Sequence, residues 1–476
     1  MKLNELLKGV EVLEIRGEGN PEINGVHYNS SKISQGGLFV AIVGYKTDGH
    51  KYIKDAVTRG ASAVVCTTFD DDTDVLQIRV RDSRVAEAQI SSNFFGNPSS
   101  KFKLIGITGT NGKTTVTYLV KQILDSMGKK TGLIGTNQNM IGDTVYETGR
   151  TTPDSFELQN LFDKMAKSNL DYVIMEVSSH ALELSRVYGC EYEVGAFTNL
   201  TQDHLDFHIT MDNYALAKAK LFKQSKYAVI NTDDSYGKAM AENCPCECLG
   251  YGAKDSASLK AENITLKQDG VGFTLGDINF NVGIPGEFSV YNALCAIGIC
   301  KSLGFGLEDI ASSLASATGV KGRAEVVDIG KRDYTVMIDY AHTPDGVENI
   351  LKTARGFAKG RVVALFGCGG DRDVTKRPIM GRVAGELADF CIITSDNPRS
   401  EDPMSIIKMV EEGIKETPTP YVVIENRYDA IKYALENALS GDVIILAGKG
   451  HETYQVIDTG TIHFDEREVI QEVLGL

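Results

Sequence analysis

The segment Thr108-Gly109-Thr110-Asn111-Gly112-Lys113-Thr114 has the residue types of a phosphate-binding loop. It stands between an expected strand and an expected helix, which is the context that such a loop requires. Its glycines let backbone N–H groups approach phosphate oxygens, Lys113 can reach the β- and γ-phosphates, and the Thr114 hydroxyl can hold Mg²⁺. The strict spacing of the common loop is not met, because Ile107 stands where its first glycine would be. The intact Gly-Lys-Thr still predicts an ATP site, against the alternative of a glycine-rich turn without a ligand.

Two further polar segments could serve either a metal ion or the fold. Glu176 opens the run 176–180 at the end of an expected strand, and its carboxylate suits Mg²⁺, although it also suits a capping role in a serine-rich turn. The run 203–208 contains two histidines four residues apart, but with no third ligand at a suitable spacing a structural pair is favoured over zinc. Lys218 lies in the amphipathic stretch 214–222, and taken alone it is expected to face solvent.

Three polar segments, two of them rich in glycine, follow expected strands in the last third of the chain: 367–373, 396–399 and 447–452. The carboxyl ends of parallel strands meet at one rim of a sheet, so these segments should converge. Arg372 and Arg399 have the planar guanidinium groups that bind carboxylates through two hydrogen bonds. Each segment alone is equally typical of a solvated loop, but together they predict a binding site.

Alternating strand and helix patterns indicate an α/β chain of three domains. We expect a small N-terminal α/β domain over 1–97, a central phosphate-loop ATPase domain with a parallel sheet over 98–325, and a C-terminal Rossmann-like domain over 326–476, which no GxGxxG motif opens. A linker is expected at 95–100 and short antiparallel strands at 258–284. The expected strands are 37–43, 63–65, 102–107, 172–177, 195–198, 227–231, 336–339, 362–366, 391–394, 422–424 and 443–446, and the expected helices include 51–59, 114–127, 289–303 and 307–316.

Length and composition narrow the class of protein. A chain of 476 residues suggests about three domains at roughly 150 residues each. The formal net charge of −15 argues against a nucleic-acid partner, although a local site can still bind small anions. No apolar run approaches the roughly 20 residues of a membrane span, and residues 1–10 carry charges and lack the long apolar stretch of a signal peptide, so we expect a cytoplasmic protein without membrane insertion. A monomer is expected, although the sequence does not determine the oligomeric state. The nine cysteines are then reduced thiols, and the alternating spacing of Cys244, Cys246 and Cys248 suits a turn better than a zinc site.

Taken together, the ordered motifs resemble those of the Mur ligases over nearly the whole chain, and most closely the branch that adds the third residue of the peptidoglycan stem peptide. Besides the segments above, the resemblance rests on Thr151-Thr152-Pro153, Thr198-Asn199-Leu200, Tyr291-Asn292-Ala293, Gly322-Arg323 and Asp339-Tyr340-Ala341-His342-Thr343-Pro344. It implies a UDP-binding domain, a central ATPase domain and a domain that binds the incoming amino acid, in an enzyme of cell-wall synthesis that serves cell shape and division.

The resemblance also implies roles for individual residues. The expected ATP-binding residues are Thr108, Gly109, Thr110, Asn111, Gly112, Lys113, Thr114, Thr115, Asn292, Arg323 and Asp339. Those for the UDP-linked dipeptide are Ser30, Thr151, Thr152, Ser178 and Arg186, and those for the amino acid are Arg372, Asp396, Asn397, Pro398, Arg399, Gly448 and Glu452. One Mg²⁺ would be held by Thr114 and Glu176, and a second by His204 and a CO₂-derived carbamate on Lys218, so that the catalytic set is Lys113, Glu176, His204 and Lys218.

The implied reaction is the ATP-dependent addition of meso-diaminopimelate to UDP-N-acetylmuramoyl-L-alanyl-D-glutamate through an acyl phosphate. Arg399 in Asp396-Asn397-Pro398-Arg399 resembles the motif that recognises the second carboxylate of diaminopimelate. The alternatives are the same reaction with L-lysine, a related Mur or folylpolyglutamate-type ligase, and a nucleotide-binding regulator without catalysis. The sequence departs from the family pattern at Asn29 and Ser31, at Leu184, and at Ala324 after Arg323.

Overall fold

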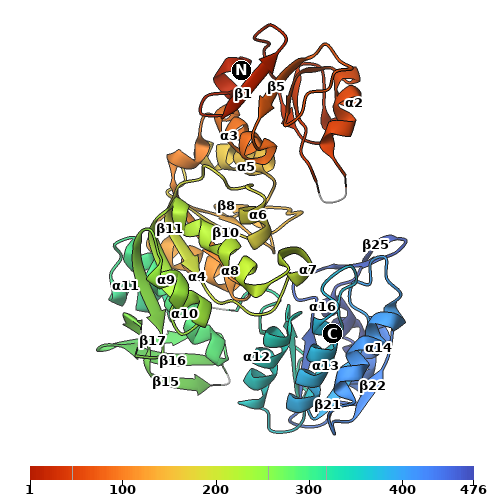
Figure 1. Ribbon diagram of the computed structural model, residues 1–476. Coiled ribbons are helices and arrows are strands. Elements are labelled where there is room, and N and C mark those ends of the chain that lie inside the picture. Colours follow the sequence, from red (N-terminus) through yellow and green to blue (C-terminus); the bar gives the residue numbers. More distant parts are fainter. Residues whose placement is uncertain (45–46, 256, 268, 318) are drawn as a thin grey trace. The chain divides into compact units, whose positions relative to one another are not determined.

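A computed structural model of the chain describes residues 1–44, 47–255, 257–267, 269–317 and 319–476. Contacts divide it into two compact units. The first comprises Met1–Gly106, Lys129–Gly195 and Ala217–Tyr227, and the second comprises Ile107–Gly128, Ala196–Leu216 and Ala228–Leu476 (Figure 1). Each unit is described by itself below. The predicted α/β class is confirmed, since parallel strands alternate with helices in the larger sheets.

The N-terminal sheet has the strand order β1-β5-β4-β3-β2. Its strands are β1 (Val12–Arg16), β2 (Val26–His27), β3 (Gly37–Val40), β4 (Ala61–Cys66) and β5 (Leu76–Val80), and the helices are α1 (Leu3–Leu6), α2 (Ile53–Thr58) and α3 (Ser83–Phe94). Successive residues of β4 pack into two different hydrophobic clusters. Ala63 and Val65 lie in the cluster that includes α3, and Val64 and Cys66 lie in the cluster that includes α2. A strand buried on both faces reads as a continuous apolar run, which explains why β3 and β4 were predictable. The expected strand 37–43 ends at Val40, and the expected helix 51–59 begins as a 3₁₀ turn, η2 (Gly49–Tyr52).

The central sheet has nine strands in the order β14-β13-β12-β11-β6-β10-β7-β8-β9. They are β6 (Lys103–Thr108), β7 (Thr131–Ile134), β8 (Asn139–Ile141), β9 (Thr144–Tyr146), β10 (Tyr172–Glu176), β11 (Tyr192–Phe197), β12 (Ser225–Asn231), β13 (Glu247–Gly252) and β14 (Leu259–Lys260). Of the expected strands, 102–107, 172–177, 195–198 and 227–231 correspond to β6, β10, β11 and β12. The linker region contains the 3₁₀ turn η3 (Pro98–Lys101).

Short helices connect the strands of the central sheet. They are α4 (Lys113–Ser126), α5 (Ser155–Lys167), α6 (Ser179–Glu183), α7 (Leu205–His208), α8 (Met211–Ala219) and α9 (Ser235–Glu242), with η4 (Lys220–Gln224) as a 3₁₀ turn. A further 3₁₀ turn, η1 (Ser30–Lys32), stands between β2 and β3 of the N-terminal sheet. The expected amphipathic stretch 214–222 is therefore divided, because the α-helix ends at Ala219 and a 3₁₀ turn follows. An antiparallel sheet, β15 (Glu262–Lys267), β16 (Gly270–Leu275) and β17 (Ile278–Val282), confirms the prediction for 258–284, except that β14 pairs in parallel with β13. The helices α10 (Glu287–Ser302) and α11 (Leu307–Leu314) follow.

The C-terminal sheet has the order β18-β19-β23-β20-β21-β22, with helices on both faces (Figure 1). Its strands are β18 (Glu325–Val327), β19 (Thr335–Asp339), β20 (Val362–Phe366), β21 (Phe390–Ile393), β22 (Tyr421–Val423) and β23 (Val443–Ala447). Helices α12 (Pro344–Arg355), α13 (Lys376–Leu387) and α14 (Pro403–Ile414) pack on one face, and α15 (Arg427–Glu436) and α16 (Glu466–Leu474) pack on the other. Pairing from β19 to β22 is parallel, as expected for a doubly wound sheet. The hairpin β24 (Tyr454–Ile457) and β25 (Gly460–His463) was not predicted.

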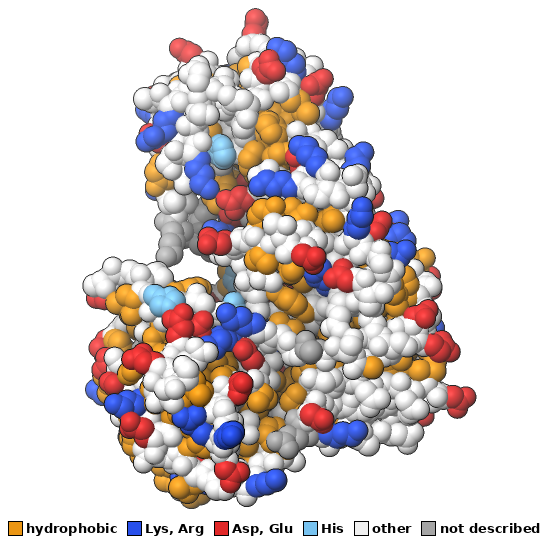
Figure 2. Space-filling model, turned by 180° about the vertical axis from the view of Figure 1, so that it is seen from behind, with side chains coloured by type: hydrophobic (Ala, Val, Ile, Leu, Met, Phe, Trp, Pro, Cys, Tyr) orange, Lys and Arg blue, Asp and Glu red, His pale blue; other side chains and the backbone are white. Residues whose placement is uncertain are grey.

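The surface carries charges of both signs. On the face drawn in Figure 2, Lys and Arg side chains are interspersed with Asp and Glu side chains rather than gathered into one basic field. Among the described residues, no helix combines the length and the apolar character needed to cross a bilayer.

Candidate active site

The phosphate-loop segment joins β6 to α4 in a conformation that requires glycine at two positions. Gly109 has a φ of 148° and Gly112 a φ of 84°, both in the region that side chains disfavour. A Cβ on Gly109 would lie 1.8 Å from the Thr198 hydroxyl oxygen, and one on Gly112 would lie 2.4 Å from Oδ1 of Asn292. The loop therefore packs directly against the residues that follow β11 and against α10.

Hydrogen bonds from the end of β11 hold this loop in shape. The Asn199 carbonyl accepts from the Thr110 N–H and the Asn199 side chain accepts from the Asn111 N–H, both at 2.9 Å. The Thr198 hydroxyl donates to the Asn111 carbonyl at 2.6 Å. The Asn111 amide donates to Asp345 of α12 at 2.6 Å, so the loop also touches the C-terminal domain. Asn199 was part of the motif Thr198-Asn199-Leu200 but was given no role, and Asp345 was not singled out from the sequence, because both roles depend on contacts between distant segments.

The charged side chain of the loop lies over its backbone. Lys113 Nζ donates to the carbonyls of Gly109 at 3.0 Å and Thr110 at 2.8 Å. Thr114 is buried at the first turn of α4, where its hydroxyl accepts from the Arg323 guanidinium at 3.0 Å. The loop thus presents a cation and a polarised hydroxyl at one helix N-terminus, an arrangement that suits an anion and its metal ion.

A cavity of about 350 Å³ opens beside the loop within the second unit. Asn111, Gly112 and Thr115 line it on the loop side, whereas Thr108 is buried below at the end of β6. The other predicted ATP residues that line it are Asn292, Arg323 and Asp339. These three come from α10, from the segment before β18 and from β19, so the fold brings together residues from widely separated parts of the sequence.

The far wall of the cavity contains groups that the sequence reading did not single out. Asp233 accepts from the Tyr291 hydroxyl at 3.1 Å and from the Ala253 N–H at 2.7 Å, and Lys254 also lines the cavity. Burial, together with the neighbouring charge of Asp233, raises the pKa of Tyr291, which keeps its hydroxyl protonated. Of the residues on this side of the cavity, only those of the motif Tyr291-Asn292-Ala293 were quoted from the sequence.

Arg323 and Asp339 are oppositely charged side chains that line the cavity. The Arg323 guanidinium lies 4.6 Å from the centre of the Tyr340 ring, and its Nε is buried without a hydrogen-bond partner among the described protein atoms. Burial raises the pKa of Asp339 despite the opposing Arg323 charge and the Ala324 N–H, which donates to it at 2.6 Å. Ala324 itself has a φ of 46°, so a small residue stands at a strained position.

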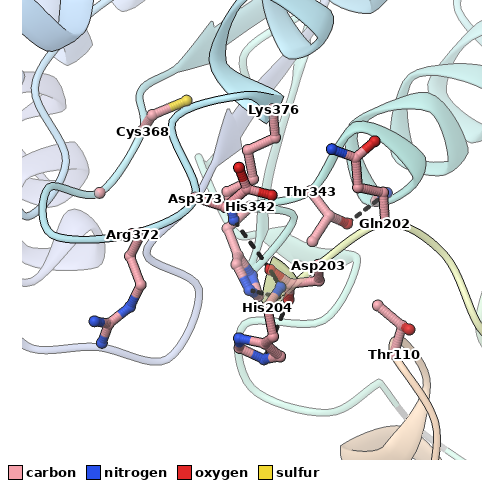
Figure 3. A network of polar contacts seen from close by, with 12 residues as sticks. Thr110, Gln202, Asp203, His204, His342, Thr343, Cys368, Arg372, Asp373 and Lys376 are labelled. Carbon is pink, nitrogen blue, oxygen red and sulfur yellow. Dashed lines mark hydrogen bonds and ion pairs between the residues drawn. The ribbon is translucent and has the colours of Figure 1, made fainter. Parts of the chain in front are cut away.

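A network centred on Asp203 connects the loop after β11 with the C-terminal domain (Figure 3). The His204 N–H donates to Asp203 at 2.9 Å, and the carboxylate lies 3.3 Å from His204 Nε2, 3.7 Å from His342 Nε2 and 3.4 Å from Lys376 Nζ. Burial would raise the pKa of Asp203, but the His342 hydrogen bond and the charges of His204 and Lys376 lower it well below its ordinary value. Asp203 is thus an anion that orients His204, which has a left-handed backbone with φ 56°.

The two histidines of this segment do not form a zinc pair. His208 is buried and stacks on Tyr214 with ring centres 4.9 Å apart, whereas His204 meets Tyr214 edge-on at 6.1 Å. Among the residues that the structure describes, no group of three or more His, Cys, Asp or Glu side chains is placed to hold a metal ion. The two rings therefore contact Tyr214 in different orientations, although they are four residues apart.

In the first unit, Glu176 and the predicted dipeptide residues share one hydrogen-bond network. Glu176 is buried at the end of β10, where its carboxylate accepts from the Thr136 N–H at 2.8 Å and the Thr136 hydroxyl at 3.0 Å. The Thr151 hydroxyl lies 3.0 Å from that of Thr136. The Thr152 hydroxyl donates to the Glu176 carbonyl at 2.8 Å and accepts from the Ser178 N–H at 3.0 Å.

Arg186 extends the network and Ser30 does not join it. Arg186 donates to the Thr152 carbonyl at 3.2 Å and pairs with Asp154 at 2.9 Å. Ser30 lies in η1 of the N-terminal sheet domain, where its hydroxyl hydrogen-bonds to Asp55. The structure therefore groups four of the five predicted dipeptide residues and places Ser30 elsewhere in the first unit.

Lys218 is buried, not exposed. Taken from the helical pattern alone it was expected to face solvent, and this interpretation is wrong, because only 1% of the residue is accessible. Burying an ammonium group is costly unless it is paired or chemically altered.

Two arginines meet where the first two rim segments of the C-terminal sheet lie together. Arg399 donates to the Gly370 carbonyl at 2.8 Å and to the Asn397 carbonyl at 3.3 Å, which brings the segment 396–399 against 367–373. Burial lowers the pKa of Arg399, and the positive charge of Arg372 lowers it further. Two guanidinium groups that repel each other form a site that an anionic group would stabilise.

The third rim segment supplies a buried carboxylate, Glu452. Its Oε2 accepts from Lys449 Nζ and from the Asn397 amide, both at 2.9 Å, and Lys449 is fully buried. A Cβ on Gly448 would lie 2.4 Å from Oδ2 of Asp396, so the third segment packs tightly on the second. Lys449 was overlooked in the sequence, although it stands three residues before Glu452 in the same glycine-rich run.

The hairpin β24–β25 lines the same rim. The Val456 N–H donates to Asn397 Oδ1 at 2.9 Å, and the Val456 carbonyl accepts from the Arg399 N–H at 3.1 Å. The Gln455 amide donates to the Asp396 carbonyl at 2.5 Å. The hairpin thus fixes the backbone of the segment that carries Arg399, a contact that the sequence patterns did not reveal.

Comparison with known proteins places this arrangement in a wider context. Three family sequence patterns match the chain: "Mur ligase family, catalytic domain" over 22–99, "Mur ligase middle domain" over 107–300, and "Mur ligase, glutamate ligase domain" over 322–450. The chain is 53% identical to the UDP-N-acetylmuramoyl-L-alanyl-D-glutamate–2,6-diaminopimelate ligase of Caldanaerobacter subterraneus subsp. tengcongensis, over 100% of this chain and 99% of that protein. It is 51% identical to the enzyme of the same name from Clostridium botulinum, with the same coverage. A solved structure of a ligase of that name is 32% identical, with a TM-score of 0.66 and 95% of both chains covered.

Proposed function

The chain belongs to the Mur ligase family, and from that premise we propose that it adds meso-diaminopimelate to UDP-N-acetylmuramoyl-L-alanyl-D-glutamate in peptidoglycan precursor synthesis. The observation that carries this proposal is the 53% identity to a ligase named for that reaction, which extends over 100% of the chain. Within the three-domain fold, we assign 1–97 to UDP binding, 98–325 to ATP binding and 326–476 to the amino acid. The proposed place of the reaction is the cytoplasm.

The cavity beside the phosphate loop is the proposed ATP site. The glycine positions at which a Cβ would clash, and the cation of Lys113 at a helix N-terminus, suit a polyphosphate. Arg323 has a buried, unsatisfied Nε beside Thr114, which a phosphate oxygen would satisfy. Asn292 and Asp339 line the remainder of the cavity and would position the nucleoside.

Two magnesium positions are proposed from the chemistry of the side chains. The Thr114 hydroxyl and the Glu176 carboxylate are hard oxygen donors of the kind that Mg²⁺ prefers. His204, oriented by Asp203, and Lys218 would hold the second ion, with Lys218 as a carbamate, because a bare ammonium would repel a cation. When bound, the ions would neutralise charge on the phosphate groups.

The proposed reaction has two steps, formation of an acyl phosphate and attack on it by the amine of the amino acid. Thr151, Thr152, Ser178 and Arg186 would hold the dipeptide, whose terminal carboxylate attacks the γ-phosphorus of ATP. The bond from that phosphorus to the bridging oxygen breaks, ADP leaves and the carboxylate becomes an acyl phosphate. Lys113 stabilises the negative charge on the transferring group. The amine of the amino acid then attacks the acyl carbon, a tetrahedral intermediate forms, and phosphate leaves. The surrounding protein must exclude water, because the acyl phosphate would otherwise hydrolyse.

The rim of the C-terminal sheet is the proposed amino-acid site. Diaminopimelate differs from lysine by a second carboxylate, and the mutually repelling Arg372 and Arg399 supply the complementary charge. With lysine bound, one guanidinium would stay unpaired at a cost of several kcal/mol, so discrimination of roughly 10² or more is expected. Glu452 and the Gly448 carbonyl would bind the distal ammonium, which both amino acids carry, and would not discriminate.

The test combines phosphate release with product mass. Release should require ATP, Mg²⁺, the UDP-linked dipeptide and the amino acid together, and Lys113→Ala should abolish it. With diaminopimelate and lysine at equal concentration, the diaminopimelate product should dominate. Arg399→Ala should lose that preference by weakening diaminopimelate, whereas Arg382→Ala, at an exposed pair with Glu416, should keep it. Comparable addition of lysine by the unmutated protein would favour the alternative substrate, and the absence of substrate-dependent release would point to a regulator.

A further inference from the structure

Three cysteines lie together at the end of the connection from α9 to β13 in the second unit, two before β13 and one within it, away from the residues assigned above. Cys244, Cys246 and Cys248 are all half-buried, so small molecules in solution can reach them. The sulfur atoms of Cys244 and Cys246 are 3.6 Å apart. The Cys248 thiol also donates a hydrogen bond to Cys244, which places Cys244 at the centre of the cluster.

The other cysteines of the chain have a different environment. Cys66, Cys190, Cys295, Cys300, Cys368 and Cys391 are buried. Burial raises the pKa of Cys66 to about 11 and that of Cys190 to about 12, so these thiols remain protonated and shielded. Any reagent that selects for exposure and thiolate character should therefore react first at 244–248.

The cluster itself favours one thiolate beside two thiols. The hydrogen bond from Cys248 is the largest influence on Cys244, and with the N–H and thiol of Cys246 it lowers the pKa of Cys244 to about 6, against the opposing effect of burial. Burial and the Cys244 charge raise the pKa of Cys246 to about 12. A nucleophilic sulfur thus lies in contact with a neighbour that can resolve a mixed disulfide.

We propose that 244–248 is a thiol–disulfide modification site in which Cys244 attacks a low-molecular-weight disulfide and Cys246 resolves the product. In the first step the Cys244 thiolate forms a bond to one sulfur of the small disulfide, whose S–S bond breaks and releases one thiolate that takes up a proton. In the second step the Cys246 sulfur, losing its proton, attacks Cys244 Sγ and releases the second small thiol. Two cysteine thiols are oxidised to one disulfide while one small disulfide is reduced to two thiols.

A metal site is the competing use of such a cluster, and the geometry does not favour it. Within the described part of the chain, no group of three or more metal-binding side chains is arranged to hold an ion. A two-sulfur reaction needs only the Cys244–Cys246 approach, which is present.

The experiment uses the full-length protein in its native state with oxidised glutathione near neutral pH. After quenching and denaturation, remaining thiols are alkylated and the protein is digested with trypsin. Cleavage after Lys238 and Lys254 releases 239–254, which contains these three cysteines and no others. We expect this peptide to lose two hydrogens and to carry one alkyl group, while the peptides of the six buried cysteines are fully alkylated.

Two variants distinguish the proposed pathway from general oxidation. Cys244→Ser cannot form the Cys244–Cys246 bond, so loss of two hydrogens from its 239–254 peptide, which would require a Cys246–Cys248 bond, should be at least tenfold slower than in the unmutated protein. Cys248→Ser should still form it, because a serine hydroxyl can also donate to Cys244. Equal rates for Cys244→Ser and the unmutated protein would overturn the proposal, as would modification of the buried cysteines before 244–248. Circular dichroism of both variants checks that the half-buried substitutions leave the fold intact.

Discussion

The buried pair of Lys449 and Glu452 permits a prediction that separates a structural role from a binding role. Lys449 is 0% exposed and Glu452 is 8% exposed, and Nζ lies 2.9 Å from Oε2. Removing one partner of such a pair leaves a buried charge without compensation, at a cost of about 3–5 kcal/mol. Lys449→Met and Glu452→Gln should each destabilise the C-terminal domain by about this amount, moderated for Lys449→Met by the Asn397 amide that still donates to Glu452.

The double variant gives the decisive comparison. In Lys449→Met with Glu452→Gln neither charge remains buried, so the loss of stability should be smaller than the sum of the single losses by about 2–3 kcal/mol. The KM for diaminopimelate should not recover in the same way, because the carboxylate proposed to bind the distal ammonium is absent. Stability and substrate affinity should thus separate in this variant.

The assays are denaturant unfolding and the KM for diaminopimelate measured by phosphate release. Lys432→Met is the control, because its pair with Glu436 is exposed and such pairs contribute about 0–1 kcal/mol. Strictly additive losses of stability would refute the coupling between Lys449 and Glu452. A double variant with the unmutated KM would refute the binding role of Glu452 and leave only a structural one.

Three further predictions concern other parts of the chain. Gly109→Ala should reduce ATP-dependent turnover at least 100-fold, because its Cβ would lie 1.8 Å from the Thr198 hydroxyl; near-normal kcat would contradict the loop geometry. Burial, with the Asp154 charge, raises the pKa of Glu87 from 4.5 to about 8. The contribution of Glu87 to the free energy of unfolding is therefore fully present below pH 4.5 and is lost as the pH rises through 8. The loss amounts to up to about 5 kcal/mol. Unfolding free energies at pH 5 and pH 8.5 should therefore differ less in Glu87→Gln than in the unmutated protein, and equal differences would show that Glu87 is not the source. Lys218→Ala should be nearly inactive, with partial recovery in a small added carboxylate, and an intact-mass gain of one CO₂ on the unmutated lysine would be the direct sign of the carbamate.

Local sequence patterns determined the elements of this protein and much of its site. The buried strands of the central and C-terminal sheets are short runs of Val, Ile and Leu. They can be recognised in the sequence because both faces of each strand are covered, which makes nearly every residue of the run apolar. The phosphate loop was also readable, since its glycines, Lys113 and Thr114 are consecutive and their chemistry depends on the local strand–loop–helix geometry. The rim segments could be expected to meet, because the carboxyl ends of parallel strands share one edge.

Tertiary structure decided what depends on partners far away in the chain. The helical pattern placed Lys218 in solvent, yet the fold buries it, because periodicity specifies a helix face and not what covers that face. Asn111 meets Asp345 across 234 positions of sequence, and no local rule predicts such a contact. Lys449 is buried against Glu452 and Asn397 only after β23 and the hairpin have assembled the rim, since the long-range packing that removes water also determines which charges must pair.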